Sequence, residues 1–95
     1  MTETRIERVA RMERYFDAVS AAVRQCPRSC LEIPEIAQMW QELVCYLEDG
    51  RWLKDFSEDE RGELPVTLKR GVLSEDGLYN LLQTVAVAQK KNTEH

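Results

Sequence analysis

The densest group of potentially reactive side chains is acidic and lies between residues 55 and 63: Asp55, Glu58, Asp59, Glu60 and Glu63. Such carboxylates can bind a hard cation or act as a general acid and base. No loop here resembles a calcium site, and hydrolysis usually needs more than carboxylates on a short helix. A small enzyme using Asp55 and Asp59 is therefore the least favoured function, and a solvated acidic face partly neutralised by cations of the same chain is preferred.

Three thiols, Cys26, Cys30 and Cys45, form the second such group. They offer one ligand fewer than a structural zinc site uses, and they lack the two-residue spacing of zinc knuckles. The only histidine, His95, is the last residue. We expect ordinary reduced thiols, with a metal site or a redox pair as lesser alternatives, and no bound metal or cofactor.

A short basic turn, Lys69-Arg70-Gly71, precedes an expected helix start at Ser74. Cations beside the free amide groups of a helix start can hold an anion. The two acidic residues after Ser74 oppose this use, because they place the protein's own negative charge at the same helix end. An anion- or nucleic-acid-binding module that uses the Lys69/Arg70 turn is therefore an alternative function.

The same turn can instead neutralise the acidic segment. Neighbouring carboxylates on one helix repel each other unless a cation faces them. We predict that Lys69 or Arg70 pairs with a carboxylate at position 55, 58 or 59, which would tie the acidic segment to the turn. An exposed and unpaired Arg70 would favour anion binding.

Four aromatic residues have the spacing of core residues on helices: Phe16, Trp40, Trp52 and Phe56. An aromatic ligand platform is the alternative interpretation. A small enzyme would need a pocket near Asp55, Asp59 or Tyr79. The sequence has no Ser-His-Asp, Cys-His or glycine-rich nucleotide motif, so no known class of enzyme is supported.

Apolar periodicity predicts four helices that would position these residues, approximately over 4–25, 34–49, 51–61 and 74–89, with a frayed tail at 90–95. Pro27 breaks the first pattern, Pro34 suits a first helical position, and Gly50 is a plausible stop. The short first connection predicts an antiparallel hairpin, with the third and fourth helices packed across it. The predicted fold is all-α, a three- to four-helix bundle in a single domain over 1–95.

Two helix starts carry specific capping signals. Thr4 and Glu7 have the spacing of a capping box, and Ser74 is expected to cap the last helix. Gly77 in the first turn of that helix costs up to about 1 kcal/mol relative to alanine. We therefore predict close packing at Gly77, beneath Trp52.

The first helix has two distinct faces. Its apolar residues follow a nearly heptad spacing: Ile6, Val9, Met12, Phe16, Val19 and Val23. Its other face carries four arginines, at positions 5, 8, 11 and 14, which we interpret as a solvated face, with an anion- or RNA-binding stripe as the alternative. The apolar face is longer than a 95-residue core easily covers, so it predicts self-association.

Composition restricts the class of protein. The chain has 95 residues, of which 43% are hydrophobic and 32% charged, and no apolar run approaches the roughly 20 residues of a membrane span. No secretory signal is visible, so we expect a cytoplasmic location. Residues 29–64 hold ten acids against three basic residues, between mildly basic ends. This pattern favours contacts between segments over a nucleic-acid surface.

Two stretches carry a family resemblance: DFSEDERGELP at 55–65 and LKRGVLSEDGLYNLL at 68–82. They resemble a family of small bacterial proteins known as the domain of unknown function number 4298. The resemblance implies a bacterial, cytoplasmic, mostly helical protein and brings no established activity, substrate or catalytic residue. The connection around Cys26-Pro27 and Cys30 departs from the family pattern, in which a more continuous helix is expected.

The leading functional prediction is a protein–protein interaction or self-assembly module, whose partner is another protein or a second copy. A membrane or nucleic-acid partner is not expected. The candidate interaction residues are Trp52, Asp55, Phe56, Asp59, Lys69, Arg70, Ser74 and Tyr79.

Overall fold

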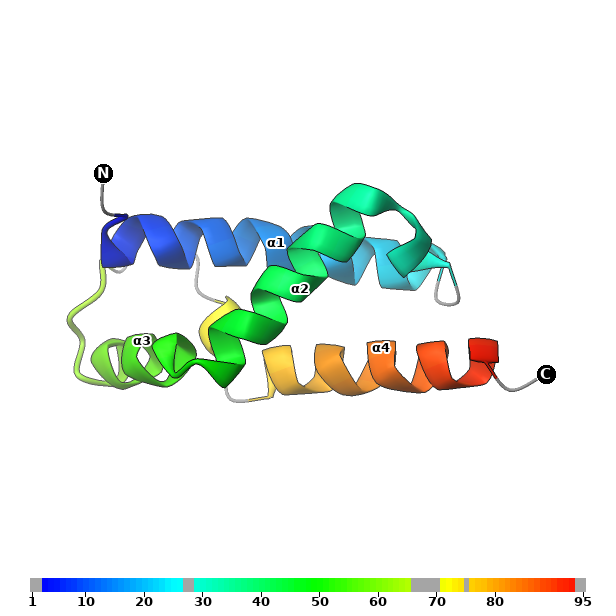
Figure 1. Ribbon diagram of the computed structural model, residues 1–95. Helices are drawn as coiled ribbons and strands as arrows, with labels where there is room; N and C mark the ends of the chain where they lie inside the picture. Colours follow the sequence, from blue (N-terminus) through cyan, green and yellow to red (C-terminus); the bar gives the residue numbers. More distant parts are fainter. Residues whose placement is uncertain (1–2, 27–28, 66–70, 75, 94–95) are drawn as a thin grey trace.

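The computed structural model describes residues 3–26, 29–65, 71–74 and 76–93 (Figure 1). Within these ranges the fold is all-α, as predicted, and every regular element is helical. The elements are α1 (Arg5–Gln25), the 3-10 turn η1 (Cys30–Glu32), α2 (Pro34–Glu48), α3 (Arg51–Glu60), the 3-10 turn η2 (Gly71–Leu73) and α4 (Gly77–Thr93).

The helices pack around α1 and η2. Figure 1 shows α2 returning diagonally across α1, so that these two helices form the predicted hairpin. α3 contacts α2, and α4 packs on α1. The short turn η2 contacts α1, α3 and α4. η2 therefore joins three helices that are distant in the sequence.

The first three helices begin where their sequence signals predict. The Thr4 amide donates to Glu7 Oε1 at 3.2 Å and the Glu7 amide donates to Thr4 Oγ1 at 3.1 Å, which is the predicted capping box. Pro34 opens α2. Between α2 and α3, Gly50 has a φ of 91°, a left-handed conformation that glycine adopts without the strain a side chain would bring.

The predicted start of the last helix is wrong. Ser74 does not occupy the cap position next to the helix start, and its amide instead donates to the Gly71 carbonyl at 3.0 Å and closes the η2 turn. α4 begins three residues later, at Gly77, and the Asn80 amide donates to the Asp76 carbonyl at 2.8 Å. The helix continues to Thr93, so residues 90–93 of the expected frayed tail are helical.

Gly77 is closely packed, as predicted, but against different neighbours. A Cβ atom at this position would lie 3.0 Å from the Gly71 carbonyl oxygen and 3.4 Å from Phe16 Cζ. The three nearest atoms belong to Gly71, Ser74 and Phe16, and Trp52 is not among them. Gly77 therefore lets the first turn of α4 approach the backbone of η2.

The core lies between the hairpin, η2 and α4. Its largest fully buried side chains include Tyr46, Met12 and Leu43. The apolar face of α1 is mostly covered by the chain itself, through the buried residues Val9, Met12, Val19 and Val23. Ile6, which is 47% exposed, is the exception on that face. The surface predicted for self-association is therefore largely used within the fold.

Candidate functional site

Asp55, the first candidate site residue, is completely buried on α3. Its two oxygens accept hydrogen bonds from the Arg8 guanidinium, Nε to Oδ2 at 2.8 Å and Nη2 to Oδ1 at 2.5 Å. The Tyr46 hydroxyl donates to Oδ2 at 2.7 Å. Both carboxylate oxygens are thus engaged by the chain, which leaves Asp55 without access to a substrate.

A second ion pair lies beside the first. Arg5 pairs with Glu58, which is also buried. The Arg5 Nε atom lies 4.0 Å from Asp55 Oδ1. Two arginines of α1 therefore face two carboxylates of α3. The arginine face of α1, interpreted from the sequence as solvated, supplies the cations that the acidic helix needs.

The prediction that Lys69 or Arg70 supplies those cations falls on residues outside the described ranges. Arg5 and Arg8 account for Asp55 and Glu58 without them. The hydrogen bonds that Arg8 donates to Asp55 raise the pKa of Arg8. Burial, followed by the hydrogen bond to Asp55, raises the pKa of Tyr46, because both disfavour a phenolate.

Trp52 and Phe56 are structural residues of α3. Their rings stack with centroids 4.9 Å apart and an interplanar angle of 13°. The Trp52 Nε1 group donates to the Val72 carbonyl at 2.9 Å. The Val72 amide donates to Glu13 Oε1 at 2.8 Å. Two side chains from separate helices therefore hold both backbone groups of one residue in η2.

The sequence interpretation missed Glu13. It is buried on α1 beside Met12, and a Cβ added to Gly71 would lie 3.3 Å from its Oε2 atom. A carboxylate next to an apolar helix face is the signal that could have identified it, because a buried acid requires a donor.

The other candidates are dispersed. Asp59 is partly buried on α3. Ser74 is exposed after η2. Tyr79 is 57% exposed on α4, and its hydroxyl accepts a hydrogen bond from Gln83 Nε2 at 2.7 Å. The structure therefore does not gather the predicted residues into one site, and Asp55 and Tyr79 belong to different environments.

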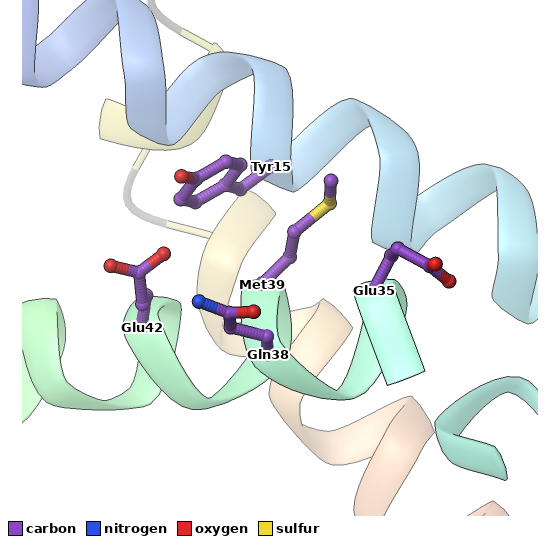
Figure 2. A pocket seen from close by; sticks show the side chains of 5 residues that line it. All are labelled: Tyr15, Glu35, Gln38, Met39 and Glu42. Carbon is purple, nitrogen blue, oxygen red and sulfur yellow. The ribbon is translucent and has the colours of Figure 1, made fainter. Parts of the chain in front are cut away.

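An open cavity lies where α2 crosses α1 (Figure 2). It is lined by Tyr15, Glu35, Gln38, Met39 and Glu42. At its edge, Arg11 lies 5.6 Å from the centre of the Tyr15 ring and donates to Glu42 at 3.2 Å. Arg11 also donates to Glu3, and these hydrogen bonds lower the pKa of Glu3. None of the five residues that line the cavity was a candidate site residue in the sequence analysis.

The surface of α4 is the second feature that the sequence did not single out as a whole. Residues 77–89 contain no charged side chain. Leu78, Leu81 and Val85 face the core. On the other side, Tyr79 and Val87 are 57% and 54% exposed. The helix is thus uncharged on its outer face as well as apolar on its buried face.

The described residues give no support for metal chemistry or a membrane span. They contain no group of three or more histidine, cysteine or acidic side chains placed to hold a metal ion. None of the three cysteines forms a disulfide within the described ranges, and Cys26 and Cys45 are exposed whereas Cys30 is buried. Among the described helices, none has the length and apolar character needed to cross a membrane.

Comparison with known proteins gave one match. The family model for a domain of unknown function, DUF4298, matches residues 9–94. The comparisons with curated proteins and with solved structures gave no match.

Proposed function

The chain belongs to the DUF4298 family, a domain of unknown function, and from this premise we propose that it is a protein–protein interaction module. The partner is another protein or a second copy of this chain. The bacterial, cytoplasmic setting implied by the resemblance is part of the same proposal. The surface we assign to the contact is the α4 outer face, defined as Tyr79, Gln83, Ala86 and Val87.

The observation that carries the proposal is the lack of charge on this exposed face. Positions 79, 83, 86 and 87 share one side of a helix, since residues three, four, seven and eight apart are neighbours there. All four side chains are exposed. In a chain with 32% charged residues, α4 has no charge from 77 to 89. Uncharged surface that exposes large apolar side chains such as Tyr79 and Val87 is typical of protein contacts.

The charged groups elsewhere support this choice over the other two functions. Arg5, Arg8 and Arg11 are paired with carboxylates, so they do not form a free basic stripe for an anion or a nucleic acid. Asp55 is buried with both oxygens bonded, which opposes a role as a catalytic base. The Lys69/Arg70 turn lies outside the described ranges and remains a prediction.

The contact surface also differs from the one predicted from the sequence. The apolar face of α1 was the expected self-association surface, but Val9, Met12 and Val19 are completely buried. The four residues of the α4 outer face are instead exposed, so the described core does not bury them. We therefore assign the contact to α4.

Site-specific photo-crosslinking in the host cell tests the proposal. A benzophenone amino acid would replace Gln83 in the full chain, and Glu48, exposed on α2, would be the control position. We expect a crosslinked product at position 83 that is absent at position 48. The mass of the product distinguishes a second copy from a different protein.

Two matched substitutions make the test specific. Val87→Glu and Leu53→Glu each place a carboxylate at an apolar side chain, 54% and 61% exposed, so both variants should stay folded. Only Val87→Glu should abolish the product at position 83. If position 83 gives no more product than position 48, and sedimentation shows a monomer at every concentration, the proposal is wrong.

A further inference from the structure

The cavity between α1 and α2 has a volume of about 180 Å³. Figure 2 shows the Tyr15 ring from α1 facing the ends of Gln38 and Glu42 on α2, with Met39 between the helices and Glu35 at the far end of the row. The lining thus combines an aromatic ring and a thioether with two carboxylates and an amide. Figure 2 shows the Glu35 carboxylate directed away from the other four side chains.

The cavity already borders a cation. The Arg11 guanidinium carbon lies 5.6 Å from the Tyr15 ring centroid, within the range of a cation–π interaction. The Arg11 Nη1 group donates to Glu42 Oε1 at 3.2 Å. The ring and the carboxylate therefore show the geometry that binds a guanidinium group.

Arg11 does not neutralise the cavity. Its Nε and Nη2 groups donate to Glu3 at 2.7 and 3.0 Å, so one positive charge is shared between Glu3 and Glu42. Across the part of the chain that the structure describes, Glu35 and Gln38 have no hydrogen bond or ion pair from their side chains. Acceptor groups and negative charge are thus available at the opening.

We propose that this cavity receives the cationic end of a lysine or arginine side chain from a partner protein. The source of the cation rests on the proposed function, whereas the chemistry of the cavity does not. Such a side chain can lay its alkyl stem on Met39 and Tyr15 and keep its charged head at the polar rim. There Glu35 can accept a charge-assisted hydrogen bond, which a neutral side chain cannot supply with equal strength.

Nuclear magnetic resonance titration of the full chain tests this site with defined probes. The probes are N-acetyl-lysine methylamide, N-acetyl-arginine methylamide and the uncharged N-acetyl-norleucine methylamide. We expect saturable shifts of the Gln38 side-chain amide and the Met39 methyl with the two cationic probes only. The shifts should weaken as salt is added, because exposed charges are screened. Spermidine, in a separate titration, represents a free polyamine.

A matched pair of substitutions links binding to the cavity. Glu35→Gln removes a carboxylate that has no partner among the described residues, so the fold should persist. We expect it to weaken binding of the cationic probes about two- to fivefold, the range of an exposed ion pair. Glu48→Gln makes the same change in charge on α2, at an exposed residue outside the cavity lining, and should leave binding unchanged.

Three results would overturn the inference. They are no saturable shift with either cationic probe, equal shifts with the norleucine probe, and equal losses in the Glu35→Gln and Glu48→Gln variants. Binding of spermidine alone would also reject a partner side chain as the occupant. Retained binding of the cationic probes, with no more crosslinked product at position 83 than at position 48 and a monomer in sedimentation, would reject the proposed function while supporting the cation site.

Discussion

Arg8 and Asp55, 47 positions apart in the sequence, form a two-pronged ion pair that joins α1 to α3. The carboxylate is fully buried, and the arginine side chain is only 17% exposed. A buried carboxylate is costly unless its charge is balanced and its oxygens are hydrogen-bonded. The Arg8–Asp55 pair therefore fixes the position of α1 relative to α3, because Asp55 can be buried as a charged group only where Arg8 contacts it.

Replacing Arg8 with methionine should destabilise the fold strongly, since it leaves the buried Asp55 charge with the Tyr46 hydrogen bond and with Arg5 Nε 4.0 Å away. Removing one partner of a buried pair costs about 3–5 kcal/mol. Urea denaturation followed by circular dichroism measures this loss. Arg14→Met, on the exposed side of α1, should change the free energy of unfolding by less than about 0.5 kcal/mol. Equal effects of the two substitutions would contradict the structural role of Arg8.

Replacing Tyr46 with phenylalanine should lower stability by about 1–3 kcal/mol at neutral pH, because Asp55 loses a buried donor. The raised pKa of Tyr46 also predicts a pH dependence. The stabilising effect of the Tyr46 hydroxyl is complete below the unfolded-state pKa of about 10. It is lost as the pH rises toward the folded-state pKa. The deficit of the variant should therefore shrink above pH 10 by about 1.4 kcal/mol per pH unit.

Tyr79→Phe is the control for that pH dependence, because the Tyr79 hydroxyl is exposed and bonds only to Gln83 within the described chain. Its free energy of unfolding should follow the wild-type curve through alkaline pH. A Tyr46→Phe deficit that is constant up to pH 11, or that grows, would show that the hydroxyl is not held in its neutral form by the fold.

Replacing Gly77 with alanine should destabilise the protein, although alanine is the better helix former by about 1 kcal/mol. The new Cβ would lie 3.0 Å from the Gly71 carbonyl oxygen, a backbone atom that cannot rotate away. Overpacking of this kind costs about 1–3 kcal/mol. Thermal denaturation should give a lower midpoint than wild type.

Asn80→Ala, on an exposed position of the same helix, should be neutral or slightly stabilising and serves as the control for Gly77→Ala. A higher midpoint for Gly77→Ala than for wild type would mean that α4 can move away from η2 without loss of packing.

Much of the helical framework could be predicted from the sequence because its signals are local. The capping box at Thr4, proline at position 34 and the left-handed Gly50 act over a few residues, and each has the predicted effect. The prediction at Ser74 failed because Ser74 ends the preceding turn and α4 begins only at Gly77. The sequence alone does not show that Gly71–Leu73 closes a turn of its own.

The contacts of the candidate site could be predicted only in part. Like charges on α3 predicted a cationic partner correctly, but the identity of that partner depends on which helix faces α3. The arginines of α1 have the spacing of a solvated face. Helical periodicity cannot reveal that Asp55 and Glu58 of α3, distant in the sequence, pair with Arg8 and Arg5. Glu13 was missed for the same reason, because its donor, the Val72 amide, belongs to a distant turn.

The attachment of Val72 to Glu13 and Trp52 has a consequence for the order of folding. The η2 turn can form these hydrogen bonds only after α1 and α3 have come together. Its docking therefore requires contacts between segments distant in the sequence, whereas the pairing of α1 with α2 joins neighbouring helices. Because α4 packs on η2, the carboxyl-terminal helix gains part of its support only in this late step. η2 and α4 are thus expected to open together, at a lower free energy than the hairpin.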